Sequence, residues 1–262
     1  MIRRLAIAAG VLLVAGAFLF DGLVGSAIER SATRTFGVET RVGFARMRPV
    51  AGELRLRRAR VANPPGFESP WFLRVDRTDV EARLLDLRHR KVEIPLVELD
   101  GVEVSLERDG KRTNYGAILQ NMGRFEGGGP AREASSKQFV VRRLLIRNVQ
   151  AHVEWNAVAA RQTSLELTIP EIELRDLGEG GGLTTSELAN LVTKAILGSI
   201  ARSGGSLPGA LVSGLNAGLR ELGGAPDVIV RGVGKSLGDQ VGELGRKAAD
   251  ALGGLLRGGD DE

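Results

Sequence analysis

Residues 97–107, VELDGVEVSLE, decide the fold of this chain. Apolar and charged residues alternate on both sides of Asp100-Gly101, but the apolar positions change there from odd numbers to even numbers. The same pattern recurs 47 residues later in residues 144–155, LLIRNVQAHVEW, where Asn148 stands in the place of Gly101. A period of two is typical of a strand with one buried face, so both copies are predicted to be strands.

The change of phase has two interpretations. Glycine and asparagine tolerate the left-handed backbone of a bulge, and one extra residue there would return the apolar side chains to the same face of a long, bent strand. Alternatively, Asp100-Gly101 is a turn dipeptide that joins the two strands of a hairpin. The second copy changes phase without a turn dipeptide, so we expect the bulge.

Similar alternation extends from Val38 to Leu174, for example at residues 54–57 and 165–169. Each segment is apolar on one face and charged on the other, as in an antiparallel sheet with one side in water. We therefore expect an α+β fold with a twisted, groove-like antiparallel sheet of bulged long strands. A short helix is predicted to begin at Asn114, with Ile118, Leu119 and Met122 on one side.

The chain changes character after residue 177, where 21 of its 36 glycines lie. Thr184 and Glu187 have the spacing of a capping box, which predicts a helix beginning there. Amphipathic stripes then follow at residues 211–222 and 230–255. We expect residues 178–262 to be a glycine-rich helical region beyond a sheet domain at residues 29–177.

The N-terminal end contains an apolar run from Leu5 to Phe20 after Arg3 and Arg4. This pattern predicts a transmembrane helix within residues 1–28, with the main domain in the periplasm and a single span in the inner membrane. A cleaved signal peptide is the alternative, because Gly25-Ser26-Ala27 has the small residues that a signal peptidase requires.

Composition argues against most enzyme classes. The chain has no cysteine and only two histidines, which excludes disulfides, thiolate metal sites and cysteine nucleophiles. A net charge of +4 and 4% aromatic residues argue against binding nucleic acid. We predict no enzyme activity, no cofactor and no metal, and we interpret His152 as an exposed histidine on the wet face. The arginines at positions 55, 57, 58 and 60 either meet anionic headgroups or form a solvated strand face.

The turn sequence Asn63-Pro64-Pro65-Gly66-Phe67 suggests a family. Together with the preceding Gly52-x-Leu54-x-Leu56 and the later Thr113-Asn114, it makes residues 1–177 resemble the N-terminal region of the AsmA-like family of bacterial inner-membrane proteins. The resemblance implies a periplasmic, groove-shaped sheet that holds lipid acyl chains, with roles in lipid transport and outer-membrane homeostasis. The glycine-rich C-terminal helices depart from the family's pattern.

Two functions follow as expectations. The first is a membrane-anchored protein that binds or handles lipid, with membrane lipid and other envelope proteins as partners. The apolar residues expected to line its groove are Leu54, Leu56, Val75, Val80, Val97, Leu99, Val102, Val104, Leu106, Leu144, Ile146, Val149, Val153, Leu165, Leu167 and Ile169. The alternative is a non-enzymatic structural or protein-interaction module in which the C-terminal helices close the sheet.

Overall fold

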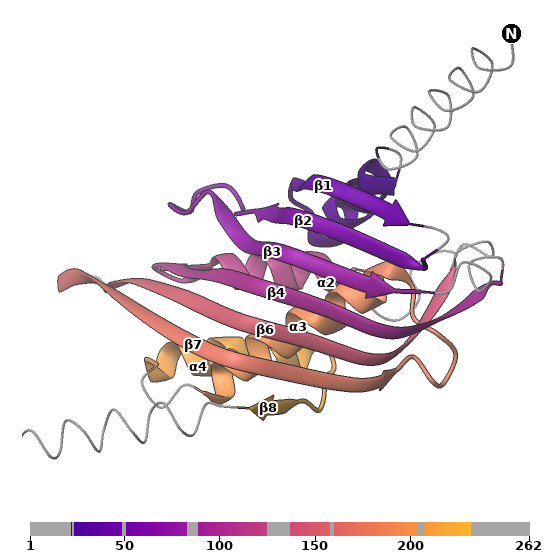
Figure 1. Cartoon of the computed structure of the whole chain (residues 1–262). Coiled ribbons are helices and arrows are strands. Elements are labelled where there is room, and N and C mark those ends of the chain that lie inside the picture. Colours follow the sequence, from indigo (N-terminus) through magenta and orange to yellow (C-terminus); the bar gives the residue numbers. More distant parts are fainter. Residues whose placement is uncertain are drawn as a thin grey trace, which may run out of the picture.

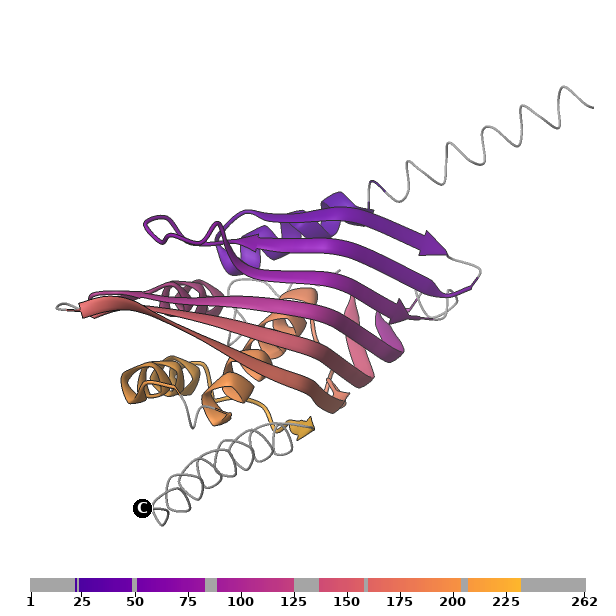
Figure 2. The ribbon, with the colours of Figure 1, turned by 60° about the vertical axis from the view of Figure 1, so that its left-hand side comes forward.

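The computed structural model of the protein describes residues 22, 24–48, 51–82, 89–124, 137–157, 160–203 and 207–231. One eight-stranded sheet forms a layer, and helices cover one of its faces (Figures 1 and 2). We call the covered side of the sheet the inner face and the opposite side the outer face. The strands are β1 (Thr40–Arg48), β2 (Glu53–Ala62), β3 (Trp71–Glu81), β4 (Lys91–Asp109), β5 (Arg112–Thr113), β6 (Gln138–Ala157), β7 (Ala160–Leu177) and β8 (Ile229–Arg231). The helices are α2 (Asn114–Gly123), α3 (Thr185–Arg202) and α4 (Gly209–Glu221), preceded by an N-terminal helix described over residues 24–36.

The sheet is mixed, which corrects the expectation of an antiparallel sheet. Its order is β1-β2-β3-β4-β6-β7-β8, with β5 paired to β4. All neighbours are antiparallel except β4 and β6, which run parallel. Parallel neighbours need a crossover connection, and α2 lies on this one.

The parallel pair is the repeat found in the sequence. Lys91 pairs with Gln138 at one end and Asp109 with Asn156 at the other, so every pair in between is 47 residues apart. Two copies of one pattern lie side by side in the same direction, and their apolar positions therefore match along the whole pair.

In six strands the apolar positions switch between odd and even numbers, and the residues at which they switch lie opposite one another across the sheet. We call this row of residues the crease. Both β4 and β6 run through it without a break, so the hairpin interpretation is wrong. Gly101 has a φ of 66° and Asn148 a φ of 53°, as the bulge interpretation expects. The register is the same on both sides of the row, however, so no strand has an extra unpaired residue. By register, the crease consists of Gly43, Arg58, Asp76, Gly101, Asn148 and Pro170.

The crease places the apolar side chains of both halves of each strand on the inner face. Leu99 and Val102 lie on opposite sides of it, and both belong to the same hydrophobic core. A second row of this kind contains Pro95, Arg142 and Asp176, whose φ is 52°. The apolar side chains of both halves therefore pack in one core with those of the helices. Figure 2 shows the sheet bending around these helices.

The N-terminal helix packs against the first strand. The carboxylate of Glu29 accepts a hydrogen bond from the backbone N–H of Val42 at 2.7 Å, and the hydroxyl of Thr33 accepts one from Thr40 at 2.9 Å. Phe36, at the end of this helix, is buried in the core. The predicted boundary between residues 28 and 29 falls inside this helix.

The predicted membrane-spanning helix and inner-membrane localisation are corrected by the structure. Among the residues that it describes, no helix is both long enough and apolar enough to cross a membrane. The run from Leu5 to Phe20, on which the prediction was based, lies outside the described residues.

The first two C-terminal helices form close to where the sequence predicts them. The Thr184 hydroxyl accepts from the N–H of Glu187 at 3.2 Å, and the Glu187 carboxylate accepts from the N–H of Thr184 at 2.7 Å, which confirms the capping box. The stripe predicted at residues 230–255 does not begin as a helix, because its first residue, Val230, belongs to strand β8. The rest of that stripe lies outside the described residues.

Candidate functional site

The structure brings the predicted groove residues together on the inner face, mostly beneath helices. Twelve of them are buried in one core that also contains apolar side chains of α2, α3 and α4. These twelve are Val75, Val97, Leu99, Val102, Val104, Leu106, Leu144, Ile146, Val149, Val153, Leu167 and Ile169. Val80 and Leu165 are partly buried against the same core. Leu54 and Leu56 are partly exposed and lie outside it.

The covering helices fit closely because of a glycine. A Cβ added at Gly218 of α4 would lie 2.8 Å from Cδ1 of Leu119 on α2, so the Leu119 side chain would have to move to make room for it. Leu215, on the same helix, is completely buried in the core, and Ile196 of α3 is 2% exposed. The glycines in these helices thus allow close packing over the sheet.

The Asn63–Phe67 turn is held by a buried carboxylate. Glu107, 5% exposed, accepts hydrogen bonds from Asn63 Nδ2 at 2.6 Å and from the N–H groups of Glu68 and Ser69 at 2.7 and 3.0 Å. Asn114 is completely buried and donates from Nδ2 to Asn63 Oδ1 at 3.0 Å. We call Asn63, Glu107 and Asn114 the turn network. It fixes the turn to β4 and to the start of α2, and it gives the family-like motif a structural role here.

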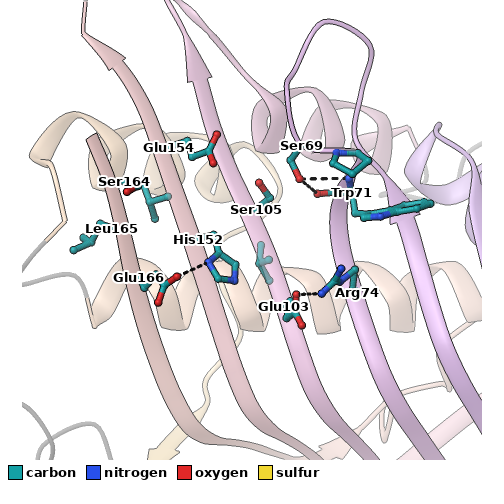
Figure 3. Close-up of a pocket in the computed structure, with 13 residues that line it drawn as sticks. Ser69, Trp71, Arg74, Glu103, Ser105, His152, Glu154, Ser164, Leu165 and Glu166 are labelled. Carbon is teal, nitrogen blue, oxygen red and sulfur yellow. Dashed lines mark hydrogen bonds and ion pairs between the residues drawn. The ribbon is translucent and has the colours of Figure 1, made fainter. Parts of the chain in front are cut away.

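The outer face carries a pocket of about 320 Å³ that spans β3, β4, β6 and β7 (Figure 3). His152 lies near its centre, with Nδ1 3.3 Å from Oε1 of Glu166. Arg74 pairs with Glu103 at one side of the pocket. Trp71 lines the rim, with the guanidinium of Arg60 5.3 Å from its ring centroid.

This pocket offers polar contacts to a ligand. An imidazole held by a carboxylate can serve as a general base, provided that a nucleophile lies beside it. Within the described part of the chain, His152 has no hydroxyl among its hydrogen-bond partners. Those residues also contain no group of three or more histidine, aspartate or glutamate side chains that could hold a metal ion. The polar side chains that line the pocket can form ion pairs and hydrogen bonds with a ligand.

No family model and no curated protein matches this chain. The resemblance to the AsmA-like family therefore stays a prediction from the residues quoted above.

The turn network was missed by sequence reasoning. Glu107 directly follows the buried Leu106, and both side chains are buried, so the alternation fails at this point. One signal was available in the sequence. Glu107 is a glutamate that ends the regular alternation of apolar and charged residues in its strand. Asn114 was recognised only as the start of a helix.

A second buried carboxylate makes the stability depend on pH. Glu173 is completely buried and accepts from Nε of both Arg175 and Arg143 at 2.9 Å. Burial disfavours its charged form, but the two arginines outweigh this effect and lower its pKa. The lowered pKa means that Glu173 stabilises the fold above its unfolded pKa of about 4.3, and that this contribution is lost as the pH falls through the folded pKa.

We therefore expect Glu173→Gln to flatten the loss of unfolding free energy on acidification below about pH 5. Urea denaturation at a series of pH values measures this slope. Glu166→Gln is the control, because the side chain of Glu166 is 79% exposed. An unchanged slope in Glu173→Gln would refute the assignment.

Proposed function

We propose that this protein is a non-enzymatic interaction module whose helices close the inner face of the sheet. One observation supports it: apolar side chains of α2, α3 and α4 share a single core with twelve of the residues predicted to line a groove. An apolar face that is already filled by the chain's own helices cannot at the same time hold acyl chains. The module is then left with its outer face and its edges for binding partners.

The absence of cysteine allows a direct test, since any introduced thiol is the only one in the chain. Val149 is completely buried on the inner face, and its neighbour Gln150 is exposed. We expect an apolar maleimide to modify Val149→Cys at least about 100-fold more slowly than Gln150→Cys in the folded full chain, because a buried thiol reacts only after local opening. Comparable rates would mean that the inner face is open and would refute the proposal.

A second candidate function is acyl-chain binding at one corner of the inner face. Leu54 and Leu56 on β2 and Val80 on β3 form an apolar strip there that the helices leave partly exposed. Each methylene buried on this strip would contribute about 0.8 kcal/mol to binding. In this second candidate function, the protein binds lipid as the sequence predicts, but only at this strip.

A neutral photoreactive lipid distinguishes the candidates. Labelling of the full chain, mapped by peptide mass spectrometry, should concentrate at the strip if acyl chains bind there, and Leu56→Gln should abolish it. Thr78→Ser, a polar substitution opposite Leu56, is the control that should retain the label. Label spread evenly over the surface would remove the second candidate.

A further inference from the structure

The outer side of β1 and β2 is strongly basic. The two strands together contain seven arginines and one glutamate. Six of these arginines are exposed, and one of the six, Arg48, lies 3.7 Å from Glu53. We call the surface that the other five form around Phe44 the arginine face. It consists of Arg41, Arg46, Arg57, Arg58 and Arg60.

Strand pairing places arginines directly opposite each other on this face. Arg41 pairs with Arg60, and Arg46 pairs with Arg55, across β1 and β2. Arg57 pairs with Arg77 across β2 and β3. Like charges at directly opposed positions destabilise a sheet. Carboxylates compensate part of this repulsion, since Arg41 lies 2.7 Å from Glu39 and Arg55 lies 3.0 Å from Glu53. Arg46 and Arg57 have no such partner among the described residues.

On the rest of the outer face, arginines are paired with carboxylates. Arg77 lies 3.3 Å from both Asp79 and Asp100, and Arg147 lies 2.6 Å from Glu98 and 3.1 Å from Glu171. By contrast, no carboxylate of the described residues lies within ion-pair distance of Arg46, Arg57 or Arg58. The positive charge is therefore concentrated at β1 and β2 and is not a general property of the sheet.

Two further features lie on the arginine face. Phe44 is 46% exposed, unusual for a large apolar side chain on this fold. Arg58 has a φ of 54°, a left-handed conformation that costs a non-glycine residue roughly 1–2 kcal/mol. Nothing covers the outer side of β1 and β2 in the described part of the structure (Figure 1).

We propose that the arginine face binds the surface of an anionic lipid bilayer. Charge complementarity supports this proposal, because Arg46, Arg57 and Arg58 have no carboxylate partner among the described residues and can bind the phosphates of lipid headgroups. An exposed phenylalanine among arginines suits the boundary between headgroups and acyl chains. Nucleic acid fits less well, since it calls for several stacking aromatics and this face has one. Binding through the outer side of β1 and β2 does not depend on whether the inner face is closed.

Vesicle partitioning of the full chain tests this inference. We compare phosphatidylcholine vesicles with vesicles that also contain phosphatidylglycerol, and take the ratio of the two partition coefficients. The apolar run of residues 5–20 would contribute equally to both, so the ratio isolates the effect of charge. Arg46→Gln/Arg57→Gln should lower the ratio about 25-fold, at about a factor of five for each arginine. Added salt should lower the wild-type ratio toward that of the variant.

The matched control removes two positive charges elsewhere. Arg30→Gln/Arg34→Gln changes two exposed arginines of the N-terminal helix and should leave the ratio within about threefold of wild type. Thermal melts should show Arg46→Gln/Arg57→Gln at least as stable as wild type, because opposed arginines are relieved. An equal loss in both variants, no preference for anionic vesicles, or tighter binding to polyglutamate or an oligonucleotide would each overturn the proposal.

Discussion

Replacing Glu107 with alanine should lower the free energy of unfolding by about 3–5 kcal/mol, as expected when three hydrogen-bond donors lose a buried acceptor. The carboxylate accepts from the N–H groups of Glu68 and Ser69 and from Asn63 Nδ2. Without it, these three donors lose their partner, and the side chain that ties the turn to β4 is gone. Urea denaturation followed by circular dichroism measures the loss.

Two other variants define the cause of that loss. Glu107→Gln keeps the shape and one acceptor oxygen, so it should lose less stability than the alanine variant. Glu166→Ala, at an exposed carboxylate, should cost below about 1 kcal/mol. If Glu107→Ala cost no more than Glu166→Ala, the turn network would not hold the turn.

Gly101→Ala should destabilise the protein by about 2–4 kcal/mol, through backbone strain and overpacking together. The residue has a φ of 66°, and an added Cβ would lie 2.8 Å from Oδ2 and 3.0 Å from Cβ of Asp76 on the neighbouring strand. The crease leaves no room for the methyl group, because the strand on that side is fixed by its own pairs. Thermal and urea denaturation both report this loss.

Gly110→Ala is the matched control. Gly110 also has a positive φ, 59°, but an added Cβ would meet nothing within 4 Å. It should therefore cost only the backbone strain of about 1–2 kcal/mol. Equal losses in the two variants would show that the close approach at the crease contributes nothing.

Local pattern predicted the individual elements well. The alternation on both sides of Gly101 corresponds to strand β4, and the spacing of Thr184 and Glu187 corresponds to the start of α3. These features succeed because side-chain period and capping depend on neighbouring residues. The left-handed backbone at Asn148 was also predictable, since few other residues adopt it easily.

Long-range pairing was predicted poorly, although one signal was available. The 47-residue repeat could have indicated a parallel pair, because two copies of one pattern match best when they run in the same direction. Antiparallel pairing was expected because alternation with one wet face is typical of antiparallel sheets.

The candidate surfaces needed the three-dimensional arrangement. In the sequence, Arg46 and Arg55 are typical of solvated strand faces. Only the strand register shows that they lie opposite each other. Val149 looks like a groove residue until the helices are in place over it. Neither fact is encoded in the residues near these positions along the chain.

The parallel pair of β4 and β6 has a consequence for how the chain folds. Strands β1 to β4 follow one another as antiparallel neighbours, and β6 and β7 do the same, so each group can form from contacts close in sequence. Joining the groups requires the chain to close a loop of 47 residues before the first interstrand bond forms. We expect the two groups to form early in refolding and their junction to be the slow step, so substitutions at the junction should change the refolding rate more than substitutions within either group.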